Sequence, residues 1–207
     1  VGGVEGKVFS YGWLFLSLAM LIDRRWIAAG ACSGLAITFH PVVGVWGILA
    51  ACLALVIRVS RTRKVSLSFS NVALGIVTCA VCALPGLLPV FELLGETDAT
   101  TSFRANYIQV TYRLAHHVDP MMFTAFAYIF YALLTAAWLS LRRKTERSTA
   151  ESFFAMFVLA ALLIAGVGIL IGLGSRPMET MPWYKVRMSL LRFYPFRLFD
   201  VILPMAF

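Results

Sequence analysis

Charged residues are scarce in this sequence. It has 18 Lys and Arg and 10 Asp and Glu among 207 residues, so 14% of the chain is charged while 60% is hydrophobic. A soluble domain usually carries roughly 25% charged residues. This shortage excludes a soluble globular domain, a disordered chain and a nucleic-acid-binding module with a basic coat. The composition instead predicts an all-α, polytopic membrane protein whose first partner is the lipid bilayer.

Several motifs of defined chemistry are also missing. The sequence contains no P-loop, no dinucleotide fingerprint, no zinc-ligand spacing and no Ser nucleophile elbow. All four cysteines lie inside apolar runs, and the C-x-x-C formed by Cys79 and Cys82 has no second pair. We expect these thiols to behave as small apolar side chains.

Apolar runs are what the sequence has in excess. They predict five to six membrane segments at about 5–22, 27–57, 66–91, 120–141, 152–175 and 197–207, the last one truncated. A helix of about 20 apolar residues crosses a hydrocarbon core of about 30 Å. We therefore expect residues 1–207 to form a single transmembrane helix bundle, with external loops at 92–119 and 176–196.

The second apolar run, 27–57, is too long for one simple span at 1.5 Å per residue. Pro41 interrupts it, because proline removes a backbone donor and disfavours helix in the residue before it. We expect two helices, roughly 27–39 and 42–57, that meet at His40-Pro41. Two forms remain open, a kinked span and a re-entrant hairpin that enters and leaves on one face.

The formal net charge of +8 has a topological explanation. Basic residues collect in short loops at 23–25, 58–64 and 142–147. The positive-inside rule makes such loops cytoplasmic. We therefore expect a multi-pass protein of the plasma (inner) membrane, with its long loops on the external side.

The long loops carry a predicted surface helix within 92–119. Its apolar residues recur at helical spacing, and they are Phe103, Tyr107, Val110 and Leu114. Its polar residues share another face, and they are Arg104, Asn106, Gln109 and Arg113. This pattern is typical of an amphipathic helix at a membrane surface.

Two candidate site residues lie in the first part of the chain. Glu5 stands beside Lys7 at the head of the first apolar run, so it is either a catalytic acid or half of an interfacial charge pair. His40 lies at the helix break, where ionisable groups at membrane depth tend to face a cavity. It either contacts substrate or makes one structural hydrogen bond.

The densest polar cluster is YRLAHHVDP, which holds Arg113, His116, His117 and Asp119. The H-H-x-D order offers imidazole and carboxylate ligands for a divalent metal, or groups for acid–base work. Neighbouring His side chains point apart on a helix, however, and Asp119 before Pro120 also matches an N-cap followed by a helix-starting proline. All three interpretations stay open.

A basic and aromatic stretch, WYKVRMSLLRFYPFRLF, covers 183–199. Arg192 and Arg197 flank its second aromatic group, and arginine suits bidentate binding of phosphate. Trp183 and Tyr184 suit the headgroup level of a bilayer. The two arginines therefore either bind a lipid-phosphate substrate or anchor the chain to lipid headgroups.

The unit W-x-x-A-G-x-x-x-G-L-A-x-x-F-H-P, preceded by E-G-K and an apolar run, resembles the GT-C superfamily of polytopic membrane glycosyltransferases. The stretches EGKVFSYGWLFLSLAML, FHPVVGVW, YRLAHHVDP and RFYPFRLFDVILP resemble a related bacterial membrane family. The resemblance implies an external active site, a polyprenyl-phosphate sugar donor, an inverting mechanism and often a divalent metal ion. It also implies a catalytic acid in the first external loop, but no D-x-D or E-x-D motif stands in the residues before the first apolar run. We expect that acid to precede Val1 in a longer protein.

The leading hypothesis is a glycosyltransferase that moves a sugar from a polyprenyl-phosphate donor to an acceptor on the external face. Its expected catalytic residues are Glu5, His116, His117 and Asp119, and its expected substrate-binding residues are His40, Arg113, Arg192 and Arg197. A transporter or flippase of a lipid-linked or anionic solute is the alternative, because broken helices are typical of transporters too. A non-catalytic membrane scaffold is the third.

Overall fold

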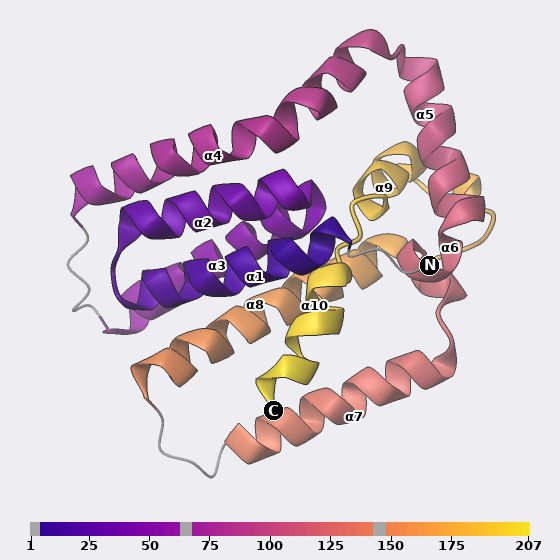
Figure 1. The fold of residues 1–207 in the computed structure, drawn as a ribbon. Helices are drawn as coiled ribbons and strands as arrows, with labels where there is room; N and C mark the ends of the chain where they lie inside the picture. Colours follow the sequence, from indigo (N-terminus) through magenta and orange to yellow (C-terminus); the bar gives the residue numbers. More distant parts are fainter. Residues whose placement is uncertain (1–4, 63–67, 143–147) are drawn as a thin grey trace. The chain divides into compact units, whose positions relative to one another are not determined.

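The computed structural model describes residues 5–62, 68–142 and 148–207 (Figure 1). Every regular element in these ranges is a helix, and helices account for 85% of the structure. The predicted all-α class is therefore confirmed. The basic loop residues Arg63, Lys64, Arg143, Lys144 and Arg147 lie outside the described ranges.

Two compact units divide the chain. Unit 1 consists of the described residues of 1–96 and 147–160, and unit 2 consists of those of 97–146 and 161–207. The helix α8 (Thr149–Gly172) contributes its first half to unit 1 and its second half to unit 2.

Unit 1 contains four successive helices, α1 (Gly6–Ile22), α2 (Trp26–Phe39), α3 (Pro41–Thr62) and α4 (Phe69–Glu96), which lie side by side (Figure 1). Serine hydroxyls join α1 to α2. Ser10 donates to the carbonyl of Ala36 at 2.8 Å, and Ser17 donates to that of Ala29 at 3.0 Å. Because the positions rise on one helix as they fall on the other, α1 and α2 are antiparallel.

Glycines bring α2 and α4 into close contact. A Cβ at Gly30 would collide with the carbonyl of Gly75, and one at Gly34 would meet Cys82 at 2.6 Å. Thr38 donates to the carbonyl of Cys82 at 2.6 Å. Small residues let helix backbones approach in this way inside membranes. The A-G-x-x-x-G-L-A unit therefore forms the α2–α4 interface.

The predicted break at His40-Pro41 is present and takes the form of a helical hairpin. His40 ends α2 in an extended conformation, and its Nδ1 accepts a hydrogen bond from the backbone N–H of Val43 at 3.2 Å. A Cβ at Gly44 would lie 2.5 Å from the backbone N of Ile37, so α3 turns back along α2. The side chain of His40 thus caps α3.

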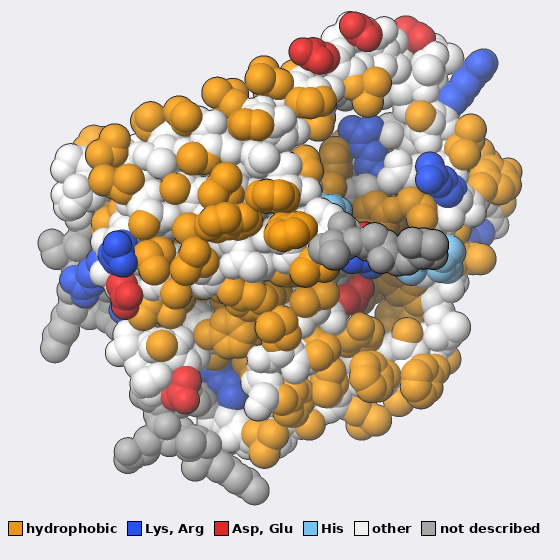
Figure 2. All heavy atoms as spheres, in the orientation of Figure 1, with side chains coloured by type: hydrophobic (Ala, Val, Ile, Leu, Met, Phe, Trp, Pro, Cys, Tyr) orange, Lys and Arg blue, Asp and Glu red, His pale blue; other side chains and the backbone are white. Residues whose placement is uncertain are grey.

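Four helices are long and apolar enough to cross a membrane. Their apolar stretches are Pro41–Arg61, Phe69–Leu93, Ala125–Arg142 and Thr149–Gly172. Little of α4 or of α7 (Ala125–Arg142) is buried, and their exposed side chains are largely hydrophobic; orange side chains cover α4 in Figure 2. Long apolar helices with exposed apolar surface of this extent are typical of chains that lie in lipid. The chain is therefore a membrane protein, while α1 and α2 are shorter apolar helices.

Helix boundaries differ from their predictions at several ends, and the end of α3 has a visible cause. Arg58 and Arg61, expected in a loop, lie in the last turns of α3. Arginine is a good helix former, and the guanidinium of Arg58 lies 5.5 Å from the ring centroid of Phe153, so packing extends the helix.

Unit 2 combines α7 and the second half of α8 with several shorter helices. Its helices are α5 (Ala99–Ile108), a π-helix (Gln109–Arg113), α6 (Ala115–Val118), α7, the second half of α8, α9 (Tyr184–Leu191) and α10 (Arg197–Ile202). Asp98 caps α5 by accepting from the backbone N–H groups of Thr100 and Thr101 at 2.8 and 3.0 Å. The helix predicted within 92–119 is therefore present as α5 and its π-helical extension.

Candidate functional site

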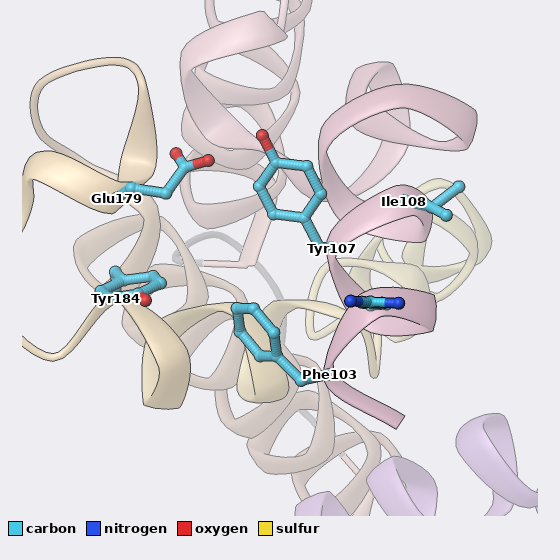
Figure 3. A pocket seen from close by; sticks show the side chains of 6 residues that line it. Phe103, Tyr107, Ile108, Glu179 and Tyr184 are labelled. Carbon is cyan, nitrogen blue, oxygen red and sulfur yellow. The ribbon is translucent and has the colours of Figure 1, made fainter. Parts of the chain in front are cut away.

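Unit 2 contains a pocket between α5 and the segment after α8. Its volume is about 350 Å³, and its lining residues are Phe103, Arg104, Tyr107, Ile108, Glu179 and Tyr184 (Figure 3). The first four come from consecutive turns of α5. Glu179 comes from the short 3-10 helix Met178–Thr180, and Tyr184 begins α9. Residues more than 70 positions apart thus share one site.

Aromatic rings form one wall of this pocket. The rings of Phe103 and Tyr184 meet edge to face, with centroids 6.1 Å apart. The Lys185 ammonium lies 5.5 Å from the centroid of the Phe103 ring. Such a wall can bind the apolar face of a ligand, and the ammonium provides positive charge beside it.

Tyr107 and Glu179 form the polar wall. The Tyr107 hydroxyl hydrogen-bonds to the Glu179 carboxylate, and in Figure 3 the carboxylate is directed toward that hydroxyl. This bond lowers the pKa of Glu179 from its ordinary value of 4.5. The same bond, with a second one to Tyr112, strongly raises the pKa of Tyr107. At neutral pH the pocket therefore holds an ionised carboxylate and a neutral phenol.

Arg104 supplies the pocket's guanidinium. It is exposed, and no ion pair joins it to any residue in the described ranges. A guanidinium can bind a phosphate or carboxylate through two parallel hydrogen bonds. The pocket thus combines a cation, an aromatic wall and a hydrogen-bond acceptor, which suits a ligand carrying both an anionic group and hydroxyls.

Asp119, expected as a catalytic residue, is buried and ion-paired with Arg176. Arg176 donates from Nε to Oδ2 at 2.8 Å and from Nη2 to Oδ1. Asp119 also accepts from the backbone N–H of Met121 at 2.9 Å, which makes it the N-cap of the 3-10 turn Pro120–Met122. Both of its oxygens are therefore engaged in holding the fold.

His116 and His117 are exposed on α6, with ring centroids 4.1 Å apart. They do not point apart, as neighbouring side chains on a regular helix would, and α6 is a single turn, Ala115–Val118. Arg113 is the last residue of the π-helix, three positions before His116, and its side chain is exposed. Since Arg176 and Met121 occupy the Asp119 carboxylate, H-H-x-D offers two imidazoles but no carboxylate for a metal. Within the described ranges, no three potential ligands gather elsewhere.

Arg192 and Arg197 have different surroundings. Arg192 donates to the side-chain oxygen of Asn106, and its guanidinium lies 4.6 Å from the Phe193 ring centroid. Its Nε is buried and has no hydrogen-bond partner within the described part of the chain. Arg197 begins α10 and interacts electrostatically with Asp200. Asn106, placed on the polar surface by its sequence pattern, is buried because it meets Arg192.

Glu5 and His40 belong to unit 1. The exposed carboxylate of Glu5 forms an ion pair with Lys7. An interfacial charge pair is one of the two interpretations of Glu5 from the sequence. His40 uses Nδ1 to cap α3. The six other expected site residues belong to unit 2.

No motif in the sequence marks the six pocket residues as a site. Phe103 and Tyr107 share a helical face, and Arg104 lies beside them. The sequence therefore carries an amphipathic pattern for the wall of the pocket that α5 forms. Glu179 follows no motif, and only folding brings it to α5.

The chain was also compared with known proteins. No family model, curated protein or solved structure matches it.

Proposed function

We propose that this membrane protein is a GT-C-like glycosyltransferase that takes a sugar from a polyprenyl-phosphate donor on the external face of the plasma membrane. The observation that supports this proposal most directly is the composition of the pocket. About 350 Å³ of space is surrounded by a guanidinium that has no ion pair among the described residues, by aromatic rings and by an ionised carboxylate. A lipid-phosphate sugar offers one group to each of them.

In the proposed complex, Arg104 binds the phosphate, with Lys185 contributing positive charge. Phe103 and Tyr184 contact the apolar face of the sugar ring, and Glu179 accepts a hydrogen bond from a sugar hydroxyl. The guanidinium acts where negative charge develops as the phosphate leaves. These roles differ from the sequence-based expectation for Arg192, because Asn106 already engages that arginine.

The proposed reaction is a displacement at the anomeric carbon. The acceptor oxygen forms a bond to that carbon while the bond to the phosphate oxygen breaks. The electron pair leaves with the polyprenyl phosphate, and the acceptor's proton passes to a base. Glu179 is not assigned as this base, since its lowered pKa makes it a weak one. We derive no step through a metal ion, because H-H-x-D provides no free carboxylate.

The test uses the full-length protein in liposomes that contain a polyprenyl-phosphate hexose. We expect the wild type to consume the donor and release polyprenyl phosphate. Arg104→Ala should lower kcat/KM for the donor by about tenfold to a hundredfold, which corresponds to the loss of a charged hydrogen bond of about 1.5–3 kcal/mol. Arg61→Ala, at the exposed end of α3, is the matched control. Wild-type protein that neither binds nor consumes any such donor would contradict the proposal.

A transporter or flippase is the second candidate, and the helical hairpin at His40 favours it. Transporters build their binding sites from interrupted helices. The same liposomes distinguish the two activities. A transporter moves the intact donor across the bilayer, whereas a glycosyltransferase breaks its sugar–phosphate bond.

A further inference from the structure

We propose that α9 lies in the surface of the bilayer, with the side chains of Trp183, Val186 and Leu190 inserted among phospholipids. We call these three side chains the α9 stripe. This placement is independent of the sugar-transfer proposal, because none of the three lines the pocket.

The α9 stripe is an exposed apolar row. Trp183 is 80% exposed, Val186 51% and Leu190 43%. Val186 and Leu190 are four residues apart and lie on one side of the helix, and Trp183 is the N-cap residue just before it, in a left-handed conformation. The other side holds Met188 and Leu191, which are fully buried. Burial within unit 2 therefore explains one face of α9 and leaves the stripe exposed among the described residues of that unit.

Arg187 fixes α9 beside the end of a membrane-spanning helix. Its Nη1 donates to the carbonyl of Ile171 at 2.6 Å and to that of Leu173 at 3.4 Å. These carbonyls belong to the C-terminal end of α8, whose apolar stretch ends at Gly172. Since α8 leaves the hydrocarbon region there, α9 lies at the boundary between membrane and water.

The orientation of α9 follows from the neighbours of Arg187. Leu190 lies three residues after Arg187, so the two are neighbours on the helix surface, and the backbone carbonyl of Trp183 accepts from the backbone N–H of Arg187 at 3.0 Å. Arg187, which binds the end of α8, is therefore next to the α9 stripe on the surface of the helix. The exposed stripe faces the region around the end of α8, and in a membrane that region is filled by lipid.

The chemistry of α9 matches a phospholipid surface. Tryptophan is enriched at the headgroup level, where its apolar ring and polar N–H are both accommodated. Lys185 and Arg187 give α9 two cations, and it has no acid. An apolar row beside cations is typical of helices that bind membranes with anionic headgroups. We therefore assign a phospholipid bilayer as the partner of the stripe.

Spin labels can measure the surroundings of each α9 residue. Single cysteines would replace Trp183, Val186 and Leu190 in turn, in full-length protein whose native cysteines, including Cys32, Cys52, Cys79 and Cys82, are changed to alanine. Matched labels at Lys185 and Ser189 sample other directions of the same helix. The proteins would be placed in nanodiscs of phosphatidylcholine and phosphatidylglycerol, and relaxation by oxygen would be compared with relaxation by a water-soluble nickel chelate.

We expect oxygen to relax the three stripe labels several-fold more strongly, relative to nickel, than it relaxes the labels at 185 and 189. Equal nickel accessibility at all five positions would overturn the proposal, because α9 would then lie in water. Low accessibility of the stripe to both agents would also overturn it, because a second protein surface would then cover the stripe. If the cysteine-free protein does not fold, brominated lipid provides the same test: it should quench wild-type fluorescence more than that of Trp183→Phe.

Discussion

The guanidinium of Arg176 pairs with the buried carboxylate of Asp119, which lies 57 positions earlier in the chain. The same guanidinium donates to the carbonyl of Gly172 at 2.8 Å, at the end of α8. One side chain thus links the segment just before α7 with the C-terminal end of α8. This link holds together, within unit 2, the ends of the two segments that line the pocket.

Removing Asp119 should destabilise unit 2. In Asp119→Ala, Arg176 loses its partner and Met121 loses its cap, so we expect a loss of about 2–4 kcal/mol. Asp119→Asn keeps a capping oxygen and should lose less. Equilibrium unfolding of the full-length protein in detergent measures both changes.

Glu92→Ala, at an exposed position of α4, provides the control for this series. The double variant of Asp119→Ala with Arg176→Ala should lose less than the sum of the two single variants, because the single losses share one interaction. Additive losses would mean that the pair does not stabilise the fold.

The α2–α4 interface should not tolerate a large residue. Gly30→Leu places a side chain where the backbone of Gly75 lies, and overpacking of this kind costs about 1–3 kcal/mol. Gly12→Leu, where a Cβ meets nothing within 4 Å, is the matched control. Thermal unfolding in one detergent compares the two. Equal stability of both variants would show that the glycine contact is dispensable.

The Tyr107–Glu179 hydrogen bond should be visible in a titration. Because the pKa of Glu179 is lowered in the folded chain, the bond contributes at any pH above about 4.5 and is lost as the pH falls through the lowered value. The raised pKa of Tyr107 has the opposite pH dependence. Its contribution to the stability of the folded chain is lost only as the pH rises beyond 10. Tyr107→Phe should therefore move the pKa of Glu179 up toward 4.5. Carboxyl carbon NMR of labelled glutamate measures this shift, with Glu92 as an internal reference. An unchanged Glu179 titration would show that the hydrogen bond does not set the pKa.

The sequence predicts the local features of this fold well. Apolar runs locate the long helices, and Pro41 locates the break, because proline acts on its immediate neighbours. The A-G-x-x-x-G-L-A unit appears in the sequence only as part of a family resemblance, and the structure shows that its glycines contact α4. Local patterns of this kind depend on residues a few positions apart.

The pairings of the site depend on distant residues, so the sequence does not predict them. Arg176 has no motif that marks it as the partner of Asp119. Asn106 has a surface pattern, yet it is buried against Arg192. Only the packing of unit 2 brings these groups together. The functional roles expected from the sequence stay predictions for all eight residues, Glu5, His40, Arg113, His116, His117, Asp119, Arg192 and Arg197.

The measurement that tests the central claim most directly is capture of the donor inside the pocket. A photoreactive phenylalanine would replace Phe103 in the full-length protein, with the same residue at Ile76, an exposed position of α4, as the control. Irradiation with a labelled polyprenyl-phosphate hexose should cross-link position 103 and not position 76, and unlabelled donor should compete while free polyprenol should not. Equal labelling of the two positions, or equal competition by polyprenol, would contradict a pocket that recognises a lipid-phosphate sugar.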